Sequence, residues 1–98
     1  MPSTPTIEIV YCRLCGWGPR AGFMAQELLT TFAQGVRSVT LAPDAMGGVF
    51  AVRVDGETIW SRKAHGRFPE MREIEQGVRD RVAPGRSLRS GPGDSDAP

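Results

Sequence analysis

The sequence is poor in the residues that build metal sites and has no excess charge of one sign. It holds two cysteines and one histidine among 98 residues, too few for the roughly four ligands of a closed zinc site. The 12 Lys and Arg against 11 Asp and Glu give a net charge of +1, so no overall field attracts nucleic acid or an anionic membrane. Runs of about 18 apolar residues are also missing, which excludes a membrane-spanning helix.

The N-terminal residues lack the charged and apolar regions of a signal peptide. We therefore expect a cytoplasmic protein with neither nucleic acid nor membrane as a partner. The length of 98 residues suits one small domain. We expect a flexible N-terminus at residues 1–5, a folded domain at residues 6–83 and a disordered tail at residues 84–98, where Gly, Pro, Ser and Asp dominate.

The first half of the chain has the pattern of a βαβ unit. Residues 6–11 are β-branched and aromatic, which predicts a largely buried strand. Residues 17–33 place apolar side chains at the spacing of one helix face, and the predicted core stripe is Ala21, Met24, Ala25, Leu28, Leu29 and Phe32. Residues 36–42 predict a second strand, which should run parallel to the first.

The second half predicts a hairpin and a helix. Strand-like residues 49–54 and 57–63 flank Asp55-Gly56, a strong hairpin signal. Residues 69–83 carry apolar side chains at helical spacing, and Pro69 suits a first turn. The order β-α-β-β-β-α predicts an α/β protein, a two-layer α+β sandwich with a four-stranded mixed sheet, and this is the topology of a minimal thioredoxin-like fold.

Cys12 and Cys15 lie three residues apart, directly after the first strand and before the first helix. In a reducing compartment such a pair is more often catalytic or metal-binding than structural. A helix N-terminus favours a thiolate, and this spacing lets the second sulfur close on the first. Arg13 and Arg20 add positive potential nearby. The pattern predicts thiol–disulfide chemistry; a zinc site built by two copies, or an inert buried pair, remains as an alternative.

Other residues are candidates for docking a substrate. Gly47 and Gly48 precede a strand of the hairpin, and glycine lets another backbone approach closely, although a plain turn would use the same residues. Trp17 could flank the disulfide, or it could be a packing residue at the start of the helix. Tyr11 and Phe50 could line its edge, and core packing is the alternative explanation for both.

A basic cluster, Arg62, Lys63 and Arg67, follows the hairpin. It could meet an acidic partner or the carboxylates of glutathione, or it could be a solvated face of the domain. His65 lies within the same polar stretch. We expect it to be a solvated loop residue rather than a ligand.

Three segments together resemble a known family. "VYCRLCGW" at residues 10–17, "GGVFAVRVDGETIWSRK" at 47–63 and "GRFPE" at 66–70 are similar to the SelW/SelT/SelH selenoprotein (Rdx) family. The likeness is greatest to its bacterial SelW-like members, in which cysteine stands where the animal proteins carry selenocysteine. It spans about residues 7–84 and implies a thioredoxin-like redox protein, with glutathione or a thioredoxin-type reductant as electron partner.

The family signature matches here at Cys12, Cys15 and Trp17, and later at Gly48 and Phe50. Many relatives carry an acidic residue after that phenylalanine, where this chain has alanine. Thioredoxins proper place a cis-proline before the strand that faces the dithiol, where this chain has two glycines.

The analogy to thioredoxins and the resemblance to the SelW-like family predict different attacking cysteines. In thioredoxins the first cysteine attacks, which would be Cys12. The family resemblance puts selenocysteine at the position of Cys15, and Gly16, Gly18 and Pro19 would delay the helix start and leave that sulfur nearer to the positive helix end. We expect Cys15 to attack and Cys12 to resolve the mixed disulfide.

We therefore expect a thiol–disulfide redox protein in cell redox homeostasis that needs no bound cofactor or metal. Its mixed disulfides would form with protein thiols or glutathione. The alternative is a redox-gated binding module, in which the disulfide changes a surface around Trp17 and Phe50 without catalytic turnover. A second copy could cover the open face of the sheet.

Overall fold

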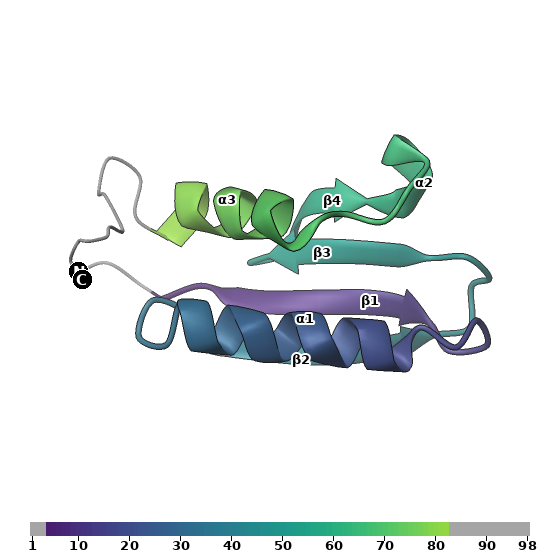
Figure 1. Cartoon of the computed structure of the whole chain (residues 1–98), viewed down its shortest axis with the longest axis horizontal. Helices are drawn as coiled ribbons and strands as arrows, with labels where there is room; N and C mark the ends of the chain where they lie inside the picture. The colour runs from purple at the N-terminus through teal and green to yellow at the C-terminus, as the bar shows by residue number, and fades with distance from the viewer. Residues whose placement is uncertain (1–3, 83–98) are drawn as a thin grey trace.

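The structure is a computed structural model and describes residues 4–82. Figure 1 shows the strands as one sheet with the longer helices lying across it. The elements in chain order are β1 (Thr6–Cys12), α1 (Gly18–Thr31), β2 (Ser38–Asp44), β3 (Phe50–Val54), β4 (Glu57–Ser61), α2 (Arg62–His65) and α3 (Met71–Val82). The predicted thioredoxin-like α/β fold is confirmed.

The sheet has the strand order β2-β1-β3-β4. β1 runs parallel to β2 and antiparallel to β3, and β3 pairs antiparallel with β4. The connection through α1 is therefore a βαβ crossover, and β3 and β4 form the predicted hairpin. Asp55 at its turn has a φ of 50°, and Gly56 a φ of 85°, the left-handed backbone that Asp-Gly turns adopt.

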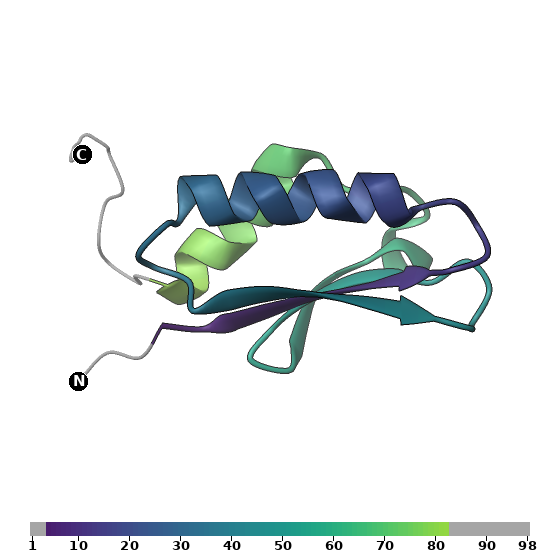
Figure 2. The same ribbon diagram turned by 90° about the horizontal axis from the view of Figure 1, so that it is seen from below.

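One hydrophobic core lies between the sheet and the two longer helices. Figure 2 shows α1 and α3 on the same side of the sheet. Their inward side chains meet those of β1, β3 and β4, because apolar residues recur at helical spacing on the helices and alternate on β1. The largest fully buried side chains include Phe50, Ile7, Ile9, Leu28, Ile74, Val52, Val78 and Cys12.

Several element boundaries differ from the predicted ones. β4 ends at Ser61, and the next four residues form α2 instead of continuing the strand. The Ser61 hydroxyl accepts a hydrogen bond from the N–H of Ala64 at 3.4 Å, and Gly66 ends the turn with a φ of 74°. A side-chain cap is a common signal at the start of a helix, and a left-handed glycine is a common signal at its end. Here the two signals enclose a single helical turn.

Two further boundaries shift for local reasons. β2 runs through Pro43 to Asp44, which is allowed because β2 is an edge strand and proline there costs no ladder hydrogen bond. α3 begins at Met71, and the N–H of Glu70 donates to the Glu73 carboxylate at 2.8 Å. This bond is the Glu half of a capping box and places the helix start after Pro69.

Leu29 is an exception in the predicted α1 stripe, since it is 41% exposed. At 100° per residue it lies at the margin of the stripe. Leu28, by contrast, is fully buried.

Both predicted chain ends extend beyond the described residues. The expected tail at 84–98 lies entirely outside them, and the expected N-terminal segment overlaps them only at residues 4–5. Pro5 is buried, and its carbonyl accepts a hydrogen bond from the N–H of Arg37 at 2.8 Å. Among residues 4–82, no helix combines the length and hydropathy needed to cross a membrane.

Candidate redox site

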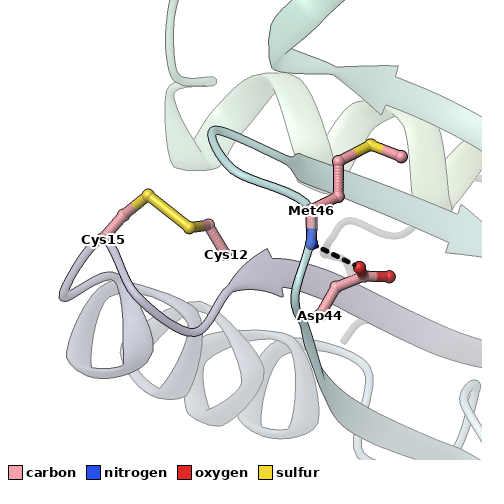
Figure 3. The surroundings of a disulfide bond; sticks show 4 residues. All are labelled: Cys12, Cys15, Asp44 and Met46. Atoms are coloured by element: carbon pink, nitrogen blue, oxygen red, sulfur yellow. Dashed lines mark hydrogen bonds between the residues drawn. A yellow bond between two sulfur atoms is a disulfide. The ribbon is translucent and has the colours of Figure 1, made fainter.

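Cys12 and Cys15 form a disulfide in the loop that joins β1 to α1 (Figure 3). Their Cα atoms are 5.5 Å apart. Backbone hydrogen bonds hold this loop on both sides: the N–H of Cys12 donates to the carbonyl of Val49 at 2.8 Å, and that of Arg13 to the carbonyl of Asp44 at 3.0 Å. The sulfur pair is thus fixed where β1 ends, between the end of β2 and the start of β3.

The two cysteines differ in burial. Cys12 is 0% exposed, because it is the last residue of β1 and lies among neighbouring strands. Cys15 is exposed on the loop. A thiol or disulfide arriving from solvent can therefore reach the sulfur of Cys15 more readily than that of Cys12.

The start of α1 adds an electrostatic difference. The helix begins at Gly18 with Trp17 as its N-cap, has no acidic residue in its first turn, and receives no side-chain cap. Its first N–H groups consequently carry uncompensated partial positive charge. Cys15 comes just before this end, and Gly16 turns the chain into the helix with a φ of 75°. The helix end favours an anion on Cys15.

An aromatic cluster packs beside the disulfide loop. The Trp17 ring makes edge-to-face contacts with Phe50 and Phe68, at centroid distances of 6.3 and 4.8 Å. Phe50 and Phe68 also contact each other, at 5.2 Å. Phe50 is 1% exposed and pairs with Tyr11 in the sheet register, so the cluster joins the redox loop to the core.

Phe68 was not among the predicted site residues. In the sequence, Phe68 is noticed only as part of the "GRFPE" segment that resembles the family. The contacts that define its role join residues that are far apart in the sequence. The cluster also explains Trp17 and Phe50 by packing, and it keeps both close to the disulfide loop.

In the fold, the three residues of the predicted basic cluster, Arg62, Lys63 and Arg67, have different surroundings. Arg67 donates two hydrogen bonds to Glu73, at 2.9 and 2.8 Å. This pairing, with the N–H of Glu70 as a second donor, lowers the pKa of the Glu73 carboxyl to about 2. Lys63 is exposed, whereas Arg62 is half-buried.

Arg62 lies instead on the aromatic cluster. Its guanidinium carbon is 5.0 Å from the Trp17 centroid and 5.1 Å from that of Phe68. Arg20, in the first turn of α1, reaches the Phe68 ring at 4.1 Å. The cations nearest to the cluster therefore come from two segments, α1 and α2.

The expectation that His65 is a loop residue is wrong. It ends α2, and although it is exposed, its ring stacks on Trp60 at a centroid distance of 3.6 Å. Its Nδ1 lies 3.0 Å from the carbonyl oxygen of Ser61. Within the described residues, no three His, Cys, Asp or Glu side chains come together as a metal-binding group.

The two predicted docking glycines lie in the segment between β2 and β3. Gly48 has a φ of 79°, which favours glycine, and a Cβ built on either Gly47 or Gly48 would meet no atom within 4 Å. The space above this segment is open. The segment between β2 and β3 begins with a turn, in which the Asp44 carboxylate accepts a hydrogen bond from the N–H of Met46 at 2.8 Å (Figure 3).

Comparisons with known proteins agree with this arrangement. The model of the Rdx family matches residues 6–80. The chain belongs to the Rdx family. No curated protein matches the chain, but solved structures of family relatives do.

One of these is a selenoprotein W-related protein from Vibrio cholerae, with 44% identity and a TM-score of 0.78 over 82% of this chain and 99% of that one. Another is a protein from Bordetella parapertussis, with 45% identity and a TM-score of 0.76 over 80% of this chain and 98% of the other. Rdx-family membership and the SelW-like resemblance are thus confirmed. The disulfide-bonded Cys-x-x-Cys lies within the matched region.

Proposed function

We propose that this protein is a thiol–disulfide oxidoreductase that cycles Cys12 and Cys15 between dithiol and disulfide. The observation that carries the proposal is the asymmetry of the pair: one sulfur is exposed before an uncapped helix end, and the other is buried within bonding distance of it. This is the arrangement that a two-step exchange needs, because the first sulfur must meet the substrate and the second must stay close to the first.

In the first step, the thiolate of Cys15 attacks one sulfur of a substrate disulfide. A mixed disulfide forms, and the other half of the substrate leaves as a thiolate. Cys12 then loses its proton to solvent and attacks the sulfur of Cys15, which closes the internal disulfide and releases the second half of the substrate as a thiolate. The substrate gains two electrons, and the cysteine pair loses two.

The cycle is completed by a reductant that reopens the internal disulfide. Glutathione or a thioredoxin-type dithiol is the proposed electron partner, and protein disulfides are the proposed substrates. Gly47 and Gly48, with open space above them, and the half-buried Trp17 beside the loop are the proposed docking residues. Phe50 is 1% exposed, so its proposed part in docking is to support the Trp17 ring against which it packs.

Limited alkylation tests which sulfur attacks. The reduced protein is treated with less than one equivalent of iodoacetamide, and the labelled peptides are quantified by mass spectrometry. The helix end favours a thiolate by about 0.3–1 kcal/mol, roughly a two- to fivefold larger share of the reactive form. Burial of Cys12 widens the difference. We expect most of the label on Cys15, and label mainly on Cys12 would reverse the assignment.

Cysteine variants test whether the exchange involves partner proteins. Cys12→Ser lacks the resolving thiol, so it should hold partners in mixed disulfides that dithiothreitol releases. Cys15→Ser, the matched control, should hold few. Equal trapping by both variants would contradict the two-step mechanism.

A second function, a redox-gated binding module, is favoured by the exposed apolar side chains beside the disulfide. Leu14, between the two cysteines, is 79% exposed, and Met46, in the turn drawn in Figure 3, is 67% exposed. For this function, a partner would bind one redox state more tightly and no substrate would be consumed. Sustained turnover with a disulfide substrate and excess reductant separates the two functions.

A further inference from the structure

Two positively charged groups share one aromatic ring beside the redox loop. The guanidinium carbons of Arg20 and Arg62 lie 4.1 and 5.1 Å from the centroid of Phe68. The two guanidinium carbons are therefore at most about 9 Å apart, a distance at which like charges repel each other. The ion pairs within residues 4–82 involve Arg53, Arg67, Arg72 and Arg81, so neither Arg20 nor Arg62 has a carboxylate partner there.

The aromatic cluster holds both side chains in place. Arg62 is half-buried, also lies 5.0 Å from the Trp17 centroid, and its Nε is buried without a hydrogen-bond partner among the described residues. An aromatic face attracts a guanidinium through the charge distribution of the ring. A guanidinium held in this way keeps donors in its own plane for another partner. The two arginines are thus positioned without being neutralised.

Their position relative to the disulfide follows from the chain. Trp17, which Arg62 covers, comes two residues after Cys15, so their Cα atoms are at most about 7 Å apart. Arg20 lies in the first turn of the helix that follows. Figure 1 shows α2, the start of α1 and the end of β1 at the same end of the molecule. The reacting sulfur of Cys15 and both guanidinium groups therefore lie at the same end of the molecule.

We propose that Arg20 and Arg62 form a carboxylate-binding pair that selects substrates with a carboxylate near the reacting sulfur. The inference rests on the proposed oxidoreductase function and names its substrate class: anionic disulfides and thiols. Guanidinium groups suit this role because their planar donors match the two oxygens of a carboxylate. The substrate's charge would relieve the repulsion between the two arginines.

Two disulfides of nearly equal shape test the proposal. Dithiodipropionic acid carries a carboxylate on each half, and its diamide is the neutral counterpart. The reduced protein is mixed with each in single-turnover experiments, and closure of the internal disulfide is followed by acid quenching and thiol alkylation. The readout is the ratio of the second-order rate constants for diacid and diamide.

We expect the wild-type protein to prefer the diacid. The double variant Arg20→Gln/Arg62→Gln should lower the diacid-to-diamide ratio by roughly three- to tenfold, the range of one modest charge-assisted contact. Dividing by the diamide rate of the same variant removes any general effect on the cysteines or the fold. Replacement of both arginines by lysine should retain only part of the preference, because the positive charge remains but the planar pair of donors is lost.

Arg37→Gln is the control for a general effect of lost charge. Arg37 is exposed and immediately precedes β2, and because β1 and β2 are parallel, it lies at the end of the sheet opposite to the disulfide. Its loss removes one positive charge, whereas the double variant removes two, and the ratio should stay at the wild-type value.

Two results would overturn the inference while leaving the proposed function intact. One is an unchanged ratio in the double variant. The other is a fall of the ratio in Arg37→Gln that is about half as large, on a logarithmic scale, as the fall in the double variant, which would indicate a general charge effect. If the wild-type dithiol reacts with neither disulfide, the proposed function fails, and the inference fails with it.

Discussion

Replacing Phe68 tests whether the aromatic cluster stabilises the redox end of the fold. Phe68→Leu keeps an apolar side chain but removes edge-to-face contacts with Trp17 and Phe50, at 4.8 and 5.2 Å. Such pairs contribute about 0.5–1.5 kcal/mol each beyond buried area. Contacts of the ring with Arg20 and Arg62 add about 0.5–1 kcal/mol each. Because leucine recovers part of the packing, we expect a net loss of about 1–3 kcal/mol in the free energy of unfolding.

Phe32→Leu is the matched control. Phe32 is only 4% exposed, whereas Phe68 is half-buried. The one cation that lies over its ring among the described residues is Arg79, 6.0 Å from the ring centroid. The assay is urea unfolding of the reduced proteins, with the midpoints compared at a common slope. Burial alone predicts a larger loss for Phe32→Leu. We expect the reverse order, and a loss at Phe68 no larger than that at Phe32 would refute the role of the cluster.

The remaining predictions concern the core, a turn and an ion pair. Ile74→Ala, at a fully buried position, should cost about 2–5 kcal/mol in urea unfolding; a smaller loss would mean that the sheet and α3 separate easily. Gly48→Ala should cost about 1–2 kcal/mol because of its φ of 79°, while Gly47→Ala, also in open space, should cost little; equal effects would contradict the turn geometry. The pKa of Glu73 is lowered to about 2 by Arg67. The ion pair therefore stabilises the folded protein fully above the pKa that this glutamate has in the unfolded chain, about 4.3, and the stabilisation is lost as the pH falls towards 2. Unfolding of the wild type and of Glu73→Gln should therefore differ at pH 7 and converge near pH 2; a constant difference would refute this.

Much of the fold follows from local sequence patterns. The alternation in β1, the apolar spacing of α1 and α3, and Asp55-Gly56 predicted those elements because each buries one face against a single core. The α2 turn was missed because four residues carry no periodicity, although Ser61 and Gly66 supply its boundary signals. β2 was placed too early because Pro43 looked like a strand end, and only its edge position makes proline acceptable there.

Part of the candidate site was also predictable from the sequence. The dithiol follows from the position of Cys12 and Cys15 between a strand and a helix. The contacts of Arg20 and Arg62 with Phe68 do not, because they join α1, α2 and the segment before α3. Long-range packing of this kind leaves no fixed spacing in the sequence.

Three features of the fold explain why Cys15 is exposed and Cys12 is buried, and why the two differ in electrostatic surroundings. β1 buries Cys12, the uncapped start of α1 adds positive potential near Cys15, and the aromatic cluster keeps the connecting loop against the core. Each feature has a structural cause of its own. Together they support a sulfur pair that exchanges electrons with a partner at one end of the sheet.

A redox titration of the Cys12–Cys15 pair bears most closely on this assignment. The protein is equilibrated in glutathione buffers of graded potential, and the disulfide fraction is measured by thiol alkylation. Every roughly 30 mV changes the equilibrium of a two-electron couple tenfold. An exchange-active pair should give a reversible midpoint between roughly −180 and −280 mV. If no disulfide forms, or if one forms that glutathione cannot reduce, the pair is structural or metal-binding and the redox function is wrong.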